Sequence, residues 1–267
     1  MSESIDALQA RERAEALLGQ AGIQVEGLQP QAGGAQHLLF KLTEPGAEQR
    51  LLKIPRRENL EDRSAQQGLA AEAEAISRLR GVKLPEPYLL LDGGAIMAHV
   101  PGQSAWFLYK QGRLSLDGLP DLCFEMGRQL SAIHRCRKPA DYQGAIPERP
   151  ELLGATPRLV HGDYHLGNVQ VVRDPRKGWT IGGVVDWVNC CWGPRELDFV
   201  ELHLSVFRQL PGTREAFLGG YRAGGSLPPD PHREKILLRT ELHRRLSAGE
   251  VPEGVTADWM RWLSELD

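Results

Sequence analysis

The 267-residue sequence lacks the features that would place a protein in a membrane or outside the cell. It has no apolar run of the roughly 18 residues that a membrane-spanning helix needs. Residues 1–9 are polar and acidic, without the apolar stretch of a signal peptide. The cysteines, Cys123, Cys136, Cys190 and Cys191, show no Cys-x-x-Cys spacing and indicate neither a disulfide framework nor a zinc site. These absences predict a cytoplasmic protein with reduced thiols and no membrane contact.

An excess of positive charge is also missing. Lysine and arginine together number 32 against 35 for aspartate and glutamate, which gives a formal net charge of −3. Because no basic stripe is present, nucleic acid is not an expected partner. Internal repeats and low-complexity tracts are absent as well. The length suits one large hydrophobic core or two small ones, and we expect a monomer or a homodimer.

The most informative stretch that is present runs from Leu159 to Val169 and reads LVHGDYHLGNV. Asp163 precedes Asn168 by five residues between two apolar runs, which is typical of a loop that leads into a strand. The Asp163 carboxylate can accept a proton from a hydroxyl, and the Asn168 amide oxygen can hold a metal ion beside phosphates. Protein kinases use the same pair as base and magnesium ligand. The spacing therefore predicts a catalytic loop for phosphoryl transfer.

A further carboxylate, Asp186, ends an apolar run eighteen residues after Asn168. Between them, residues 169–172 and 179–181 are rich in β-branched side chains and flank a turn with Asp-Pro and Gly, which predicts a hairpin. A hairpin places its two outer ends side by side, so Asn168 and Asp186 should lie close together. Two oxygen ligands at one point suit a hard, octahedral cation completed by water and phosphate oxygens.

The three motifs His161-Gly162-Asp163 with Asn168, Val185-Asp186-Trp187 and Gly193 to Asp198 resemble those of the aminoglycoside phosphotransferase and choline kinase superfamily. The resemblance implies an α+β, protein-kinase-like bilobal fold, with a small antiparallel-sheet N-lobe and a larger, mainly helical C-lobe. It implies ATP or GTP as co-substrate, Asp163 as catalytic base, and Asn168 and Asp186 as Mg²⁺ ligands. Asp198 would be a structural carboxylate that supports the catalytic loop.

The same resemblance divides the chain into lobes. Residues 1–98 would form the N-lobe with a nucleotide-binding sheet and a helix, and residues 99–103 the hinge. Residues 104–267 would form the C-lobe, with the catalytic loop and the substrate region. From the pattern of residues, 88–92 and 95–100 predict two strands around an Asp-Gly-Gly turn.

The hinge would bind the nucleotide base. Carried over from the superfamily, the Ala98 carbonyl and the Val100 amide would form hydrogen bonds with adenine, and Met97 would line the base pocket. The alternative is that this segment is an ordinary edge strand.

Two features of the first lobe point to phosphate binding. Gly33 and Gly34 lie between two predicted strands, where a flexible backbone can close over phosphates and present amide protons. A plain hairpin turn is the alternative. Lys53 lies inside an apolar strand, where a charge costs desolvation unless it meets an anion, and it resembles the lysine that contacts the α- and β-phosphates. The alternative is a solvent-facing lysine on an edge strand.

A glutamate on the helix that follows should form an ion pair with Lys53. Glu72 and Glu74 both qualify, but they lie about 200° apart on a helix, so only one can face inward. Glu72 is the preferred partner because it lies on the same face as the apolar Leu79.

Three histidines lie in or near the predicted catalytic region. His134 and His161 are expected to be structural, packing under or orienting the catalytic loop. His165 is left open between a solvent-facing and a substrate-facing position. The adjacent Cys190 and Cys191 have apolar neighbours and are expected to pack in a core rather than to act as nucleophiles.

These features together predict a small-molecule kinase. It would transfer the γ-phosphate of ATP or GTP to a hydroxyl of an aminoglycoside, an amino alcohol or a sugar. The second hypothesis is a kinase-like sensor or scaffold that binds nucleotide without turnover, and the presence of Asp163, Asn168 and Asp186 argues against it. A protein kinase fits less well because Asp186-Trp187 replaces Asp-Phe-Gly.

Overall fold

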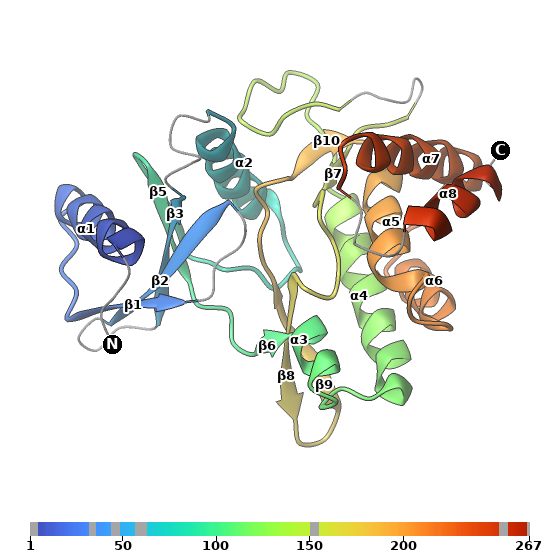
Figure 1. The fold of residues 1–267 in the computed structure, drawn as a ribbon, viewed down its shortest axis with the longest axis horizontal. Coiled ribbons are helices and arrows are strands. Elements are labelled where there is room, and N and C mark those ends of the chain that lie inside the picture. The colour runs from blue at the N-terminus through green and yellow to red at the C-terminus, as the bar shows by residue number, and fades with distance from the viewer. Residues whose placement is uncertain are drawn as a thin grey trace.

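The computed structural model describes residues 5–31, 36–43, 49–56, 63–149, 155–250 and 256–265. An antiparallel sheet fills one end of the molecule and a mainly helical part fills the other, with the two termini on opposite sides (Figure 1). The predicted α+β class, with a small sheet followed by a larger helical part, is therefore confirmed.

The N-terminal sheet has five antiparallel strands in the order β1-β2-β3-β5-β4. The strands and the preceding helix are α1 (Ile5–Gln20), β1 (Gly27–Gln31), β2 (His37–Thr43), β3 (Arg50–Pro55), β4 (Tyr88–Leu91) and β5 (Gly94–Ala98). The predicted pairing of the two strands around the Gly-Gly turn is confirmed by the position of Gln31 opposite Leu39. Gly33 and Gly34 themselves lie outside the described residues.

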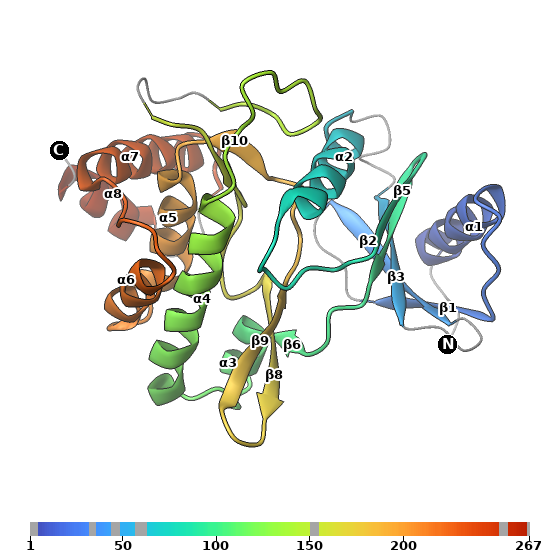
Figure 2. The same ribbon diagram turned by 180° about the vertical axis from the view of Figure 1, so that it is seen from behind.

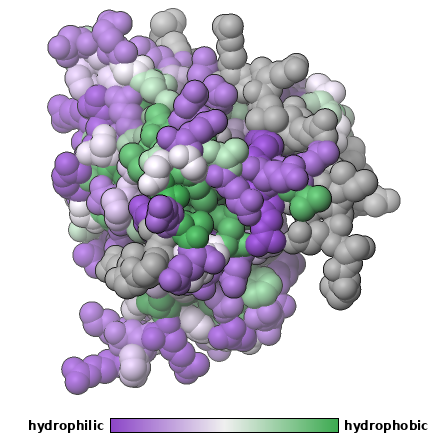
Figure 3. Space-filling model, turned by 90° about the vertical axis from the view of Figure 1, so that its left-hand side faces the viewer, coloured by the Kyte–Doolittle hydropathy of each residue, from purple (hydrophilic) through white to green (hydrophobic). Residues whose placement is uncertain are grey.

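The two faces of this sheet contact different parts of the molecule, because successive side chains of a strand point to opposite sides. Phe40, Leu42, Leu52 and Ile54 pack with the apolar stripe of α1 in a small core. Side chains on the other face, such as Lys53, line a cleft toward the rest of the molecule. The face seen in Figure 3 is mostly hydrophilic, with hydrophobic side chains gathered near its middle.

Helix α2 (Arg63–Arg78) lies between the sheet and the helical part, on the side of the sheet opposite α1 (Figure 2). Its apolar positions Ala71, Ala75 and Ile76 belong to the large core of the helical part, not to the small core beneath α1. The lobe boundaries at residues 98 and 103 stay predictions. Helix α2 comes from the predicted N-lobe, but some of its side chains belong to the core of the helical part.

The remaining elements are β6 (Gln103–Ser104), α3 (Ala105–Lys110), the short helix η2 (Leu116–Gly118), α4 (Leu119–His134), β7 (Arg158–Val160), β8 (Val169–Asp174), β9 (Gly178–Val184), β10 (Cys191–Gly193), α5 (Glu196–Leu202), the π-helical turn η3 (His203–Phe207), α6 (Thr213–Ala223), α7 (Pro231–Ser247) and α8 (Thr256–Glu265). Strands β6, β8 and β9 form a small sheet, and β7 pairs with β10. The predicted hairpin around residues 173–178 is confirmed, with Val169 opposite Val184.

Helices α4 and α6 form the closest helix pair of the large core. Glycines at the crossing, Gly127 on α4 and Gly220 on α6, allow backbone to approach backbone. Cys190 and Cys191 are buried, and burial raises the pKa of the Cys190 thiol well above its usual value, as expected for packed rather than nucleophilic cysteines. Within the described residues, no helix combines the length and the apolar character needed to cross a membrane.

Candidate active site

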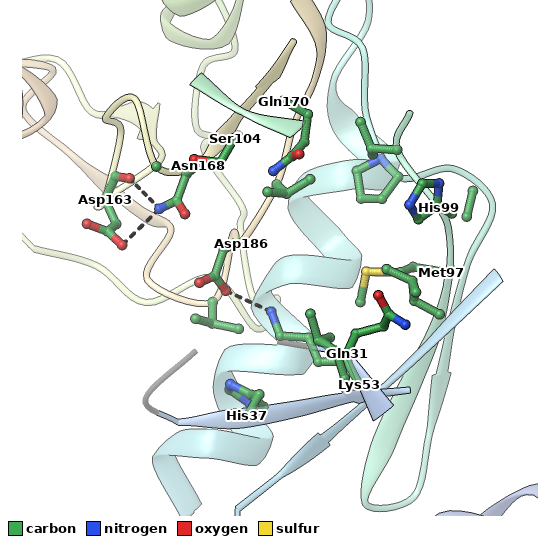
Figure 4. A pocket seen from close by; sticks show the side chains of 18 of the residues that line it. Gln31, His37, Lys53, Met97, His99, Ser104, Asp163, Asn168, Gln170 and Asp186 are labelled. Atoms are coloured by element: carbon green, nitrogen blue, oxygen red, sulfur yellow. Dashed lines mark hydrogen bonds and ion pairs between the residues drawn. The ribbon is translucent and has the colours of Figure 1, made fainter. Parts of the chain in front are cut away.

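A cleft of about 620 Å³ separates the N-terminal sheet from the helical part, a size typical of small-ligand sites. Its walls come from β2, β3 and the end of β5 on one side, and from the loops around β8 and β9 on the other (Figure 4). Residues predicted for the site that line the cleft are Lys53, Met97, Ala98, Val100, Asp163, Asn168 and Asp186. Distant segments of the sequence therefore meet at one cavity: Lys53 and Asp186, which are 133 residues apart, are joined by a hydrogen bond of 2.8 Å.

The two flanks of the β8–β9 hairpin come together at the catalytic end of the cleft. The Val185 amide donates to the Asn168 carbonyl at 3.0 Å, which holds the residues on either side of the hairpin together. Asn168 and Asp186 both face the same cavity, as predicted from the hairpin (Figure 4). Asp186 has a φ of 65°, a left-handed conformation that is costly for a residue other than glycine. Such strain at a cleft carboxylate is typical of a side chain held in place for function.

The predicted catalytic loop is closed by hydrogen bonds between its own members. The Asn168 Nδ2 group donates to Asp163 Oδ2 at 2.9 Å and to the Asp163 carbonyl at 2.8 Å. Asp163 Oδ1 lies 3.2 Å from His165 Nε2, and the Gly167 amide donates to His165 Nδ1 at 2.9 Å. Because Nδ1 accepts a hydrogen bond, Nε2 carries the proton that is donated to Asp163.

This arrangement keeps Asp163 ionised. Burial would raise the pKa of Asp163, but the hydrogen bond from His165, the electrostatic influence of His165 and His161 and the hydrogen bond from Asn168 outweigh it and lower the pKa. The contact between His165 and Asp163 was not predicted from the sequence. The only signal for it is the two-residue spacing, which brings side chains together only in a particular loop conformation.

Asp198 supports the catalytic loop from below, as expected. It accepts hydrogen bonds from the His161 amide at 2.9 Å and from the Gly162 amide at 2.8 Å. It also lies 2.9 Å from His134 Nε2, and His134 Nδ1 lies 2.8 Å from the hydroxyl of Tyr221. The buried Asp198 thus joins α4, α5 and the loop, and the structural assignment of His134 is confirmed.

His161 is likewise fully buried and bonded to the backbone. Its Nε2 lies 3.1 Å from the Val185 carbonyl, and its ring packs against Trp187 with 4.5 Å between centroids. Burial lowers the pKa of His161 despite the carboxylates around it. A neutral histidine in this position ties the predicted catalytic loop to the segment after β9 that carries Asp186, which matches the structural assignment.

Lys53 on β3 joins the sheet to both other parts of the site. Its Nζ lies 3.0 Å from Glu72 Oε2 and 2.8 Å from Asp186 Oδ1. The preference for Glu72 over Glu74 is therefore confirmed. Burial would lower the pKa of Lys53, but the charges of Glu72 and Asp186 outweigh it and raise the pKa, so the amine stays charged.

Glu72 has further partners that fix its position. Its carboxylate accepts hydrogen bonds from the Tyr88 hydroxyl at 2.8 Å and from the Trp187 amide at 2.9 Å. The side chain is almost fully buried and connects α2, β3, β4 and the segment after β9. Groups from distant parts of the chain converge on this one carboxylate, so its loss would disturb all of them.

Glu74 points to the other side of α2 and acts as a tether. It accepts hydrogen bonds from the Tyr142 hydroxyl at 2.7 Å and from the Ala145 amide at 2.6 Å, and it pairs with Arg78 at 2.7 Å. This carboxylate therefore fixes α2 to the segment that follows α4. Sequence periodicity separates the two glutamates but does not reveal this second function.

The far end of the cleft has the properties expected of a base pocket. Met97, Ala98 and Val100 line it, and the Val100 amide has no hydrogen-bond partner within the described part of the chain. An unused amide on a cleft wall is available to a ligand atom. The assignment of these residues to adenine binding stays a prediction.

The oxygen atoms at the catalytic end fit a divalent cation. Because Asn168 Nδ2 is bonded to Asp163, the amide oxygen of Asn168 is turned away from the loop and toward Asp186 (Figure 4). Burial would raise the pKa of Asp186, but Lys53 outweighs it and lowers the pKa, so a charged carboxylate oxygen is present. A carboxylate and an amide oxygen are the ligand types that Mg²⁺ takes from proteins.

Comparison with known proteins agrees with this geometry. Residues 145–237 match the phosphotransferase enzyme family. The chain is similar to the GDP complex of wild-type aminoglycoside 2'-phosphotransferase-IIIa, with 14% identity, a TM-score of 0.60, and coverage of 96% of this chain and 97% of that chain. It is also similar to macrolide 2'-phosphotransferase MphH from Brachybacterium faecium, with 16% identity, a TM-score of 0.60, and coverage of 92% and 96%.

A third similar structure is the amicoumacin kinase hAmiN in complex with AMP-PNP, Ca²⁺ and Ami, with 16% identity, a TM-score of 0.59, and coverage of 98% of this chain and 96% of that chain. At these identities the structural likeness establishes the fold. Together with the family match over residues 145–237, it confirms the resemblance drawn from the sequence motifs.

Proposed function

We propose that this chain transfers the γ-phosphate of ATP or GTP to a hydroxyl of a small molecule, because residues 145–237 match the phosphotransferase enzyme family and the fold is similar to that of an aminoglycoside phosphotransferase. The observation that carries the proposal is the meeting of Asp163, Asn168, Asp186 and Lys53 at one end of the cleft.

Asp163 is the catalytic base. Its lowered pKa keeps it ionised, so it can accept the proton of an acceptor hydroxyl placed beside it. Asn168 and His165 hold the carboxylate in one orientation through the bonds to its two oxygens. The acceptor is thereby positioned for attack on the terminal phosphate.

Asn168 and Asp186 hold Mg²⁺ in this proposal. When bound, the cation neutralises charge on the phosphates. Lys53 contacts the α- and β-phosphates, and Glu72 keeps the amine in position. In this structure Lys53 Nζ pairs with Asp186 Oδ1 at 2.8 Å. In the proposed complex, Lys53 would contact the phosphates of the nucleotide and Asp186 would bind the cation.

The acceptor belongs to the class of small hydroxyl compounds, and the relatives suggest where to start. Similar structures include an aminoglycoside phosphotransferase in complex with GDP and kanamycin, and the amicoumacin kinase in complex with AMP-PNP, Ca²⁺ and Ami. For this chain, we propose an aminoglycoside, an amino alcohol or a sugar as the acceptor class. Location in the cytoplasm and a monomeric or homodimeric state remain part of the same proposal.

The test is Mg²⁺-dependent release of ADP or GDP across a panel of aminoglycosides, amino alcohols and sugars. Asp163→Asn should lower the rate by roughly 10²–10⁴-fold, the usual span for a positioned base, while nucleotide binding persists. Asp117→Asn, an exposed aspartate on η2, is the matched control and should act like the wild type. Turnover by Asp163→Asn at the wild-type rate would contradict the assignment of the base.

The second hypothesis, a nucleotide-binding sensor, makes the opposite prediction for the same panel. It requires tight nucleotide binding without turnover on any acceptor. Asp186→Ala separates the two further, because a phosphotransferase loses its Mg²⁺-dependent turnover in this variant. A sensor has no such turnover to lose.

A further inference from the structure

One more ionisable side chain, His37, lines the phosphate end of the cleft. It is the first residue of β2, and it lies two positions before Leu39, which is the partner of Lys53 on β3. Alternate residues of a strand share a face, so His37 and Leu39 face the cleft while Leu38 and Phe40 pack toward α1. Figure 4 shows His37 near Lys53 on the sheet side of the cavity.

His37 is buried but incompletely bonded. Its exposure is only 4%, and its Nε2 has no hydrogen-bond partner within the described residues. The ring is hydrogen-bonded to the backbone of Ala65 near the start of α2. A buried polar atom without a partner costs stability, and native proteins keep few of them without a reason. A ligand atom that enters the cleft can supply the missing partner.

The charges around His37 favour a neutral ring in the free protein. Burial lowers its pKa, and Lys53 from β3 adds to this effect, whereas Asp186 after β9 and Glu72 from α2 act in the opposite direction but are outweighed. A phosphate beside the ring would add negative charge and favour the protonated form. With both nitrogens protonated, the ring can donate to the Ala65 carbonyl and also from Nε2.

We propose that His37 is a phosphate-binding residue, which takes up a proton when the nucleotide binds and donates from Nε2 to a phosphate oxygen. The proposal rests on the proposed function, which places the nucleoside di- or triphosphate beside Lys53 and Asp186. It adds a second cationic donor to the site, supplied by the sheet and present only when an anion is bound.

The experiment compares His37→Gln and His37→Leu with the wild type by titration calorimetry in Mg²⁺. The ligands are ADP or GDP, whichever binds the wild type, and the matching nucleoside. Both variants should bind the diphosphate about 10- to 100-fold more weakly, the range for a hydrogen bond to a charged group. Binding of the nucleoside should not change, because it lacks phosphate. His243→Gln, at an exposed position on α7, is the control and should bind like the wild type.

Repeating the titrations in buffers of different ionisation enthalpy measures the proton taken up on binding. The wild type should take up a fraction of a proton at pH 7.5 that both variants lack. A purely structural histidine predicts an equal loss of affinity for nucleoside and diphosphate.

Two further results would overturn the proposal, and they are distinguishable. Wild-type affinity and proton uptake in both variants would remove His37 from the phosphate site and leave the proposed function intact. Failure of the wild type to bind any nucleoside diphosphate would overturn the proposed function, and the proposal for His37 with it.

Discussion

Asp186 is the residue on which most of the site depends. It pairs with Lys53 at 2.8 Å, it is held in a left-handed backbone conformation, and its neighbour Trp187 donates to Glu72. The carboxylate thus has a cationic partner in this structure and is also the proposed metal ligand. Binding of a cation at Asp186 would free Lys53 for the phosphates.

The acid stability of the protein should depend on Asp186. Because its pKa is lowered in the folded state, its contribution to the free energy of unfolding is fully present above the unfolded value of about 3.9 and is lost as pH falls through the folded value. Asp186→Asn removes this contribution, so its stability should fall less steeply in acid. Urea unfolding between pH 3 and 7 measures how the free energy of unfolding of the wild type and of Asp186→Asn depends on pH. The same pH dependence in both proteins would contradict the prediction.

Glu72 and Glu74 should differ sharply when they are changed in the same way. Glu72→Gln leaves the buried Lys53 with a weaker partner, and we expect a loss of about 3 kcal/mol in stability and at least a tenfold lower kcat/KM for nucleotide. Glu74→Gln weakens the tether to Tyr142 and the 145–146 amides and removes the ion pair with Arg78, but it leaves the cleft unchanged, so kcat/KM should stay near the wild type. Thermal melts and nucleotide kinetics of the two variants test this contrast.

At the scale of elements, much of the catalytic half could be predicted from the sequence. The β8–β9 hairpin and the loop before it are local, and their residue pattern specifies both. Three features were not predictable: the hydrogen bond between His165 and Asp163, the tether at Glu74, and the membership of α2 in the large core. Each depends on a loop conformation or on contacts between distant segments, which local periodicity does not encode.

The crossing of α4 and α6 gives a sharp prediction of stability. A Cβ at Gly127 would collide with the Phe217 carbonyl, and one at Gly220 with the Phe124 carbonyl. Because backbone cannot give way as a flexible side chain can, Gly127→Ala and Gly220→Ala should each cost about 3 kcal/mol or more.

Gly219 is the matched control on the same helix. A Cβ there would lie 3.6 Å from the Phe124 ring, an ordinary contact. Since alanine is the better helix former, Gly219→Ala should be neutral or stabilising by up to about 1 kcal/mol. Chemical unfolding measures the free energies of unfolding of the three variants. Equal values would show that the helix crossing is looser than the structure indicates.

At the scale of the whole molecule, nucleotide should stabilise the protein because its site joins both parts. At a concentration 100 times Kd, bound Mg²⁺ and ADP or GDP should add about 2.7 kcal/mol to the free energy of unfolding. Thermal melts with and without ligand measure the shift. Asp186→Ala should lose the part of the shift that requires Mg²⁺, and a full shift in that variant would exclude Asp186 as a metal ligand.

The position of α2 has a consequence for the folding of the protein during its synthesis on the ribosome. Residues 63–78 emerge early, but Ala71, Ala75 and Ile76 on α2 belong to a core whose other members lie mostly in the later part of the chain. Until then that core is incomplete, and Glu72 has Lys53 and Tyr88 as partners but not Trp187. The first hundred residues therefore lack part of the packing around α2, and a nascent chain cannot complete the cleft before Asp163, Asn168 and Asp186 are synthesised.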